Sequence, residues 1–144
     1  MGKLYPSYLA QPIDAVIQID GFIPGCPIDP VELIRVVKLL IQNRPAFIPD
    51  YPVCIECKLL ENKCVFLDDK ICLGSVTRAG CNAKCPSYGL GCYGCRGMIS
   101  TANLNGLKIA LNEHGFDVTM LEDKIKLFQS YQRIKSENKS DGND

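Results

Sequence analysis

The stretch "CNAKCPSYGLGCYGC" (residues 81–95) holds four cysteines, with a proline directly after the second and a Cys-x2-Cys pair at its end. Four further cysteines stand upstream at positions 54, 57, 64 and 72. We call Cys54, Cys57, Cys64 and Cys72 the first set, and Cys81, Cys85, Cys92 and Cys95 the second set. Two sets of four thiols could form disulfides or bind two zinc ions or two iron-sulfur clusters. The rest of the chain has to decide among these three possibilities.

Composition disfavours disulfides and several classes of partner. The chain has 144 residues, an odd total of nine cysteines and no apolar signal segment at its start, which favours a cytoplasmic, metal-binding protein. Sixteen basic residues meet sixteen acidic ones, so no charge pattern predicts nucleic-acid binding. The most apolar run, residues 33–41, contains Arg35 and Lys38 and is too short for a membrane span.

The spacing of the cysteines favours 4Fe-4S clusters over zinc. Structural zinc sites usually take two short-spaced cysteine pairs per ion, whereas each set here has one such pair and two more distant cysteines. Six glycines between residues 74 and 97 would let backbone N–H groups approach sulfur, and six basic residues outnumber four acidic ones between 54 and 96. A structural zinc-binding adaptor remains the alternative, and spacing does not decide which cysteines share a cluster.

Upstream of the cysteine-rich segment, the sequence predicts a strand, a loop and a helix. Residues 15–19 have the β-branched character of a strand, and the Gly- and Pro-bounded loop after it presents Cys26. Asp29 is a plausible N-cap, Pro30 suits the first helical position, and Pro45 ends the helix. One strand and one helix cannot form a sheet, so this part resembles the last βα unit of a larger α/β domain.

The C-terminal part predicts two helices. The first has Leu104, Leu107 and Leu111 on one face and stops at Gly115. The second, through about residue 133, starts with a capping-box pattern of Thr119 and Glu122 and has an apolar face of Leu121, Ile125 and Phe128. The predicted fold is α+β and mostly irregular. It divides into the βα remnant at 1–45, a loop-rich two-cluster segment at 46–100, a helical cap at 101–134 and a disordered tail at 135–144.

Several single residues have ordinary structural interpretations. Without other information, Cys26 is best explained as a buried cysteine at a strand end, and His114 as a helix-end residue near the last carbonyls. Glu32, Glu56 and Glu61 are expected to be solvated charges. A role for Glu56 in tuning a cluster, suggested by its place inside Cys-x2-Cys, is the less favoured interpretation.

Three segments, "IDGFIPGCPIDPVEL", "PVCIECKLLENKCVF" and "CLGSVTRAGCNAKCPSYGLGCYGCRG", resemble the small, electron-transferring subunit of cytosolic nickel-iron hydrogenases. The similar types are the archaeal viologen-reducing, deazaflavin-reducing and sulfhydrogenase enzymes. The resemblance covers roughly residues 12 to 130 and includes Glu56, Thr77, Arg78, Gly80 and Arg96.

The resemblance implies a flavodoxin-like N-terminal domain, a ferredoxin-like segment with two 4Fe-4S clusters, and electron transfer between a nickel-iron large subunit and a flavin or iron-sulfur acceptor subunit. It implies that both sets are cluster ligands and that Cys26 is the last ligand of a third, proximal cluster. The other proximal ligands are missing, which suggests a fragment or a split subunit. No catalytic residues are visible, so the chain would be an oxidoreductase component without its own catalytic centre; a stand-alone two-cluster ferredoxin is a further alternative.

Overall fold

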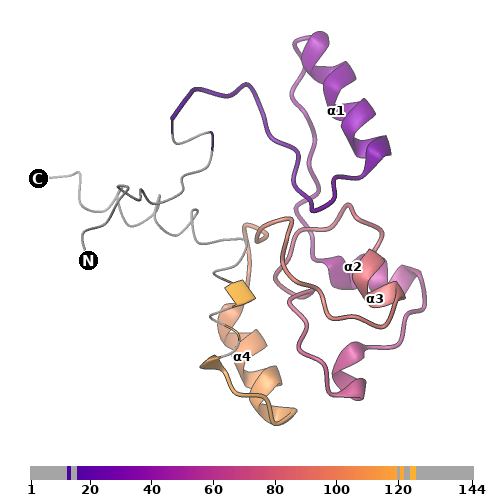
Figure 1. The fold of residues 1–144 in the computed structure, drawn as a ribbon, viewed down its shortest axis with the longest axis vertical. Helices are drawn as coiled ribbons and strands as arrows, with labels where there is room; N and C mark the ends of the chain where they lie inside the picture. Colours follow the sequence, from indigo (N-terminus) through magenta and orange to yellow (C-terminus); the bar gives the residue numbers. More distant parts are fainter. Residues whose placement is uncertain (1–12, 14–15, 120, 122–123, 126–144) are drawn as a thin grey trace, which may run out of the picture.

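The computed structural model describes residue 13 and residues 16–119, 121 and 124–125. Its elements are α1 (Pro30–Ile41), α2 (Val53–Leu59), the 3₁₀ helix η2 (Val65–Asp68), α3 (Lys84–Ser87) and α4 (Leu104–Glu113). Figure 1 shows α1 at one end, the cysteine-rich segment with α2 and α3 in the middle, and α4 at the opposite end. None of the helices in the described ranges is long and apolar enough to span a bilayer.

Helix α1 begins as predicted. The Asp29 carboxylate accepts the N–H groups of Val31 and Glu32, both at 3.0 Å, and Pro30 takes the first helical position. The helix ends at Ile41, before Pro45, because the chain turns through Asn43 in a left-handed conformation with φ of 51°. The expected end at Pro45 was therefore too late.

The strand predicted at residues 15–19 is wrong for the described positions. Residues 16–19 form a turn, a bend and irregular chain, and the side chains of Val16 and Ile17 are 72% and 58% exposed. A strand needs a hydrogen-bonded neighbour, and the described residues contain isolated bridges in place of a sheet. The β-branched pattern alone could not supply that neighbour.

The cysteine-rich segment is made of loops and short helical turns, as predicted, and backbone bonds tie three extended pieces of it together. The N–H of Val53 donates to the Thr77 carbonyl at 2.9 Å, and the N–H of Arg78 donates to the Gly97 carbonyl at 2.9 Å. The Arg78 guanidinium also pairs with Asp50 at 2.8 Å. These contacts bring α2, the 76–79 strip and the end of the second set side by side.

Helix α4 packs against the cysteine-rich segment through an apolar core. Asn103 caps its start by accepting the Gly106 N–H at 2.8 Å. The predicted apolar face is confirmed for Leu107 and Leu111, which are 3% and 0% exposed. Burying a leucine contributes about 2 kcal/mol, so this face anchors the cap. The core cluster consists of Leu73, Val76, Leu107, Leu111 and Leu121.

The next helical turn starts near Thr119, where a capping box with Glu122 is predicted. The Asp117 carboxylate accepts the Thr119 N–H at 2.9 Å, so Asp117 caps this turn. The hydrogen bonds to Thr119 lower the pKa of Asp117 below its usual range. Of the apolar face predicted for the second helix, Leu121 is fully buried and Ile125 packs against the core cluster, whereas Glu122 and Phe128 lie outside the described residues. His114 is the C-cap of α4, as expected at a helix end, and its ring stacks on Phe66 with centroids 5.3 Å apart.

Candidate functional site

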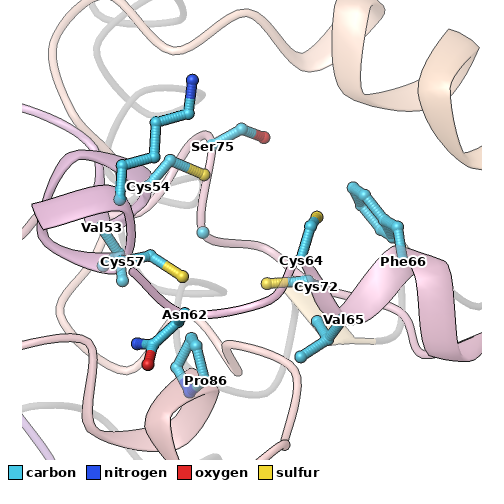
Figure 2. Close-up of a pocket in the computed structure, with 12 residues that line it drawn as sticks. Val53, Cys54, Cys57, Asn62, Cys64, Val65, Phe66, Cys72, Ser75 and Pro86 are labelled. Carbon is cyan, nitrogen blue, oxygen red and sulfur yellow. The ribbon is translucent and has the colours of Figure 1, made fainter. Parts of the chain in front are cut away.

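The first set lines one cavity of about 170 Å³. Cys54 and Cys57 stand one helical turn apart on α2, Cys64 directly precedes η2, and Cys72 follows in the next loop. Figure 2 shows the sulfurs of Cys57 and Cys72 pointing toward each other from opposite sides of this cavity. Four thiols therefore line one partly open cavity.

The second set lines a neighbouring cavity of about 70 Å³. The two cavities share two wall residues, Val53 and Pro86, so the sites lie directly beside each other. The structure thus groups the cysteines in chain order, a pairing that spacing alone left open. The second cavity is lined by the whole second set, Cys81, Cys85, Cys92 and Cys95, and by Cys26.

Backbone N–H groups point at several sulfurs. The Cys92 N–H donates to the Cys72 Sγ at 3.2 Å, so a residue of the second set hydrogen-bonds a sulfur of the first. Gly74 donates a second N–H to Cys72, and Gly94 donates one to Cys92. The prediction that glycines aim N–H groups at sulfur is confirmed at these two positions. Such donors stabilise the charge on a metal-bound thiolate.

Burial raises the pKa of thiols in both sets. The pKa of Cys54 rises to about 11, first through burial and then through repulsion from the neighbouring thiols of Cys72, Cys57 and Cys64. The pKa of Cys92 rises to about 12, mainly through burial, although the Gly94 N–H and the Thr77 hydroxyl oppose the rise. At neutral pH these thiols keep their protons, so a metal group that bound here would have to displace them.

The first cavity fits a polyatomic group rather than a side chain. A Cβ on Gly74 would lie 3.3 Å from the Cys72 sulfur and 3.4 Å from the Cys54 sulfur, so the glycine keeps the space beside them open. The volume of about 170 Å³ exceeds several-fold the ~30 Å³ occupied by one water. In the described part of the chain, no three Cys, His, Asp or Glu side chains converge as tightly as one metal ion requires. The donor set is all sulfur, as iron-sulfur clusters require.

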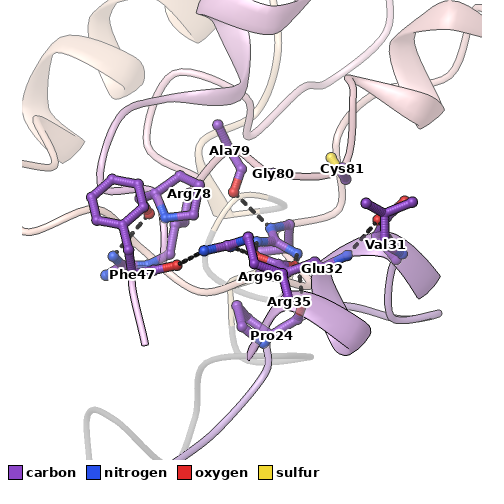
Figure 3. Close-up of polar contacts among 12 residues, drawn as sticks. Pro24, Val31, Glu32, Arg35, Phe47, Arg78, Ala79, Gly80, Cys81 and Arg96 are labelled. Atoms are coloured by element: carbon purple, nitrogen blue, oxygen red, sulfur yellow. Dashed lines mark hydrogen bonds and ion pairs between the residues drawn. The ribbon is translucent and has the colours of Figure 1, made fainter. Parts of the chain in front are cut away.

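Cys26 is held beside the second cavity by a buried arginine. It lies in an exposed loop, so the interpretation as a buried strand-end cysteine is wrong. The Arg96 guanidinium donates to the carbonyls of Pro24 at 2.6 Å and Ala79 at 2.8 Å, and it makes a bidentate pair with Glu32 at 2.7 and 2.8 Å (Figure 3). This pair joins α1 and the Cys26 loop to the second site.

Two glutamates expected to be solvated are buried. Glu32 is 6% exposed and paired with Arg96, and Glu56 is 9% exposed and accepts hydrogen bonds from the loop of Cys81. Glu61 is exposed, as expected. A sequence does not show which distant groups a charge will contact. The cation that pairs with Glu32 and the N–H donors that bind Glu56 could therefore not be predicted.

The non-cysteine residues that carry the resemblance stabilise the loops around the two sites. Thr77 donates its hydroxyl to the Leu73 carbonyl at 2.7 Å, and Arg78 donates to the Met98 carbonyl at 3.0 Å. A Cβ on Gly80, whose φ is 111°, would collide with the Arg96 guanidinium. These residues shape the loops that present the sulfurs, which explains why they accompany the cysteines.

Comparison with known proteins agrees with this chemistry. The delta subunit of sulfhydrogenase 2 from Pyrococcus furiosus is 48% identical over 72% of this chain and 44% of its own length. The similar proteins are hydrogenase subunits. A subunit of the F420-non-reducing hydrogenase vhu from Methanocaldococcus jannaschii is 32% identical over 84% of this chain and 49% of its own length. The iron-sulfur subunit of the F420-non-reducing hydrogenase from Archaeoglobus profundus is 27% identical over 90% and 50%.

The predicted resemblance is thereby confirmed as far as hydrogenase subunits, one of which is named an iron-sulfur subunit. No protein-family model matches the chain. The chain spans about half the length of the relatives it matches, so the similarity concerns that half.

Proposed function

We propose that this chain binds two 4Fe-4S clusters, one in each four-thiol cavity, and transfers electrons within a nickel-iron hydrogenase complex. The observation that carries the proposal is the arrangement of eight thiols around two adjacent cavities that share Val53 and Pro86 as walls. A cluster held by four thiolates exchanges single electrons. Two such sites in direct contact form a continuous route through the chain.

The positions of the cavities suggest the order of the route. Cys26 lies at the second cavity, so a proximal cluster that used this thiol would neighbour the second site first. The first site carries the exposed Cys64, and the exposed Leu59 and Leu67 close to it in the chain offer an apolar surface for an acceptor subunit. Electrons from the nickel-iron large subunit would therefore pass from the second site to the first.

The residues of the chain would perform three tasks in this function. The thiols bind, backbone N–H groups from Gly74, Cys92 and Gly94 stabilise sulfur charge, and apolar residues such as Val53 and Val65, 1% and 3% exposed, exclude water. Hydrogen bonds to sulfur and exclusion of water are the protein's means of setting a cluster's potential.

The experiment is anaerobic cluster assembly on the chain, followed by metal and sulfide analysis and electron paramagnetic resonance. We expect about eight irons and eight sulfides per chain. Cys64→Ser should remove about half of them, from the first site, and Cys95→Ser about half, from the second site. A preparation with zinc alone and no reducible signal would refute the proposal and favour the zinc adaptor. Copurification with a nickel-containing subunit tests the hydrogenase assignment; its failure with clusters present would favour a stand-alone ferredoxin.

A further inference from the structure

Glu56 lies in the chain between two cysteines of the first site, but its side chain contacts the second site. It stands on α2 between Cys54 and Cys57, yet its side chain turns away from the first cavity and enters the loop that carries Cys81. Its 9% exposure places the carboxylate among protein groups rather than in water. A buried carboxylate requires compensation, and the loop provides it.

The carboxylate binds on both sides of Cys81. Oε1 accepts the Gly80 N–H at 2.7 Å, and Oε2 accepts the Ala83 N–H at 3.0 Å. Oε2 also lies 3.9 Å from the Cys81 sulfur. One side chain therefore fixes the backbone before and after a ligand of the second set.

The loop that binds the Glu56 carboxylate is tightly turned. Asn82 and Ala83 are consecutive residues in the left-handed region, with φ of 53° and 44°, and Gly80 has φ of 111°. This tight turn brings the N–H groups of Gly80 and Ala83 to the two oxygens of one carboxylate. Ala83 is fully buried, so water cannot satisfy its N–H in place of Glu56.

The nearest buried cation, Arg96, is shared between Glu56 and a second carboxylate, Glu32. Arg96 interacts with Cys81 electrostatically, but its guanidinium is engaged in the bidentate pair with Glu32. Because one cation faces two carboxylates here, the Glu56 carboxylate adds negative charge beside the Cys81 sulfur. Negative charge beside a cluster disfavours the reduced form, which carries one more electron.

We propose that Glu56 is a positioning residue for the second site, that it couples assembly of that site to α2 of the first, and that its carboxylate lowers the reduction potential of the second cluster. This inference rests on the proposed function. Glu56 lies between two cysteines of the first site, and by this inference it controls the second site.

The test compares Glu56→Gln and Glu56→Ala with Glu61→Gln as the matched control, all in the cluster-loaded chain. Glu61→Gln removes the same charge five positions along, at an exposed turn. Redox titrations followed by electron paramagnetic resonance give both potentials, and Cys64→Ser and Cys95→Ser assign the signals. We expect Glu56→Gln to raise the potential of the second cluster relative to the first, and Glu61→Gln to leave that difference unchanged. Glu56→Ala should lose about half of the iron, from the second site.

The outcomes separate this inference from the proposed function. A wild-type chain that binds no clusters would overturn both. This inference alone would be overturned by two results in a chain whose wild type binds both clusters. The difference between the two reduction potentials would be the same in Glu56→Gln as in the wild type, and Glu56→Ala would retain all of its iron. Selective loss of the second cluster in Glu56→Gln would support the positioning role. Loss of both clusters in Glu56→Gln, with Glu61→Gln fully loaded, would make Glu56 a general scaffold residue and overturn it.

Discussion

Replacing Arg96 with methionine should detach α1 and the Cys26 loop from the second site. Arg96 and Glu32 are 2% and 6% exposed, and Arg96→Met leaves the buried carboxylate with Arg35 alone, whose guanidinium is 3.7 Å away and half-exposed. Removing one partner of a buried ion pair costs about 3–5 kcal/mol. The variant also loses the hydrogen bonds to the carbonyls of Ala79 and Pro24. We therefore expect the loss at the upper end of that range.

Hydrogen exchange is the suitable assay because it reports local opening, whereas global unfolding of a cluster protein is not a two-state process. A loss of about 3–5 kcal/mol lowers the protection of α1 amides by about 140-fold to about 3,700-fold, at about 1.4 kcal/mol per tenfold. The affected amides should include that of Val36, which lies on the buried side of the helix.

Arg35→Met is the matched control, since Arg35 contacts the same carboxylate at 3.7 Å from the exposed side. A partly exposed pair contributes about 0–1 kcal/mol, so protection should fall less than about tenfold. The double variant Glu32→Leu, Arg96→Met removes the unpaired charge and should recover part of the loss. Equal effects of Arg96→Met and Arg35→Met, or no recovery in the double variant, would refute the reasoning.

Three further predictions concern the sites. Gly91→Ala places a Cβ into the Ile71 carbonyl, so the loop must shift and we expect incomplete iron loading, measured by metal analysis; full loading would contradict this. Thr77→Val removes the hydroxyl bond to the Leu73 carbonyl, which keeps the N–H groups of Val76 and residue 77 as donors, so the variant should lose about 0.5–1.5 kcal/mol, seen as lower protection in hydrogen exchange. In the cluster-free chain, the exposed Cys64 should be alkylated faster than the buried Cys92, whose rate should rise with pH toward about 12 as thiolate forms; equal rates would show that the cavity does not persist without clusters.

Local chemistry was predictable where neighbours in the chain decide it. The cap at Asp29, the proline at the first helical position and the buried leucines of α4 follow from rules that span one or two turns. The two sets of cysteines were visible for the same reason, because ligand type and count are properties of the sequence. The strand at 15–19 failed because a strand depends on a partner far away in the chain.

Residue types and spacings by themselves determined the sulfur-rich chemistry, the absence of a strong charge bias and the helical ends of the segment. The tertiary structure decided which thiols share a cavity, that the two cavities touch, and that Glu32 and Glu56 are buried. The physical reason is the range of the interactions. Glu56 meets its N–H donors more than twenty positions away, and Glu32 meets Arg96 across 64 positions, where no local pattern records the contact.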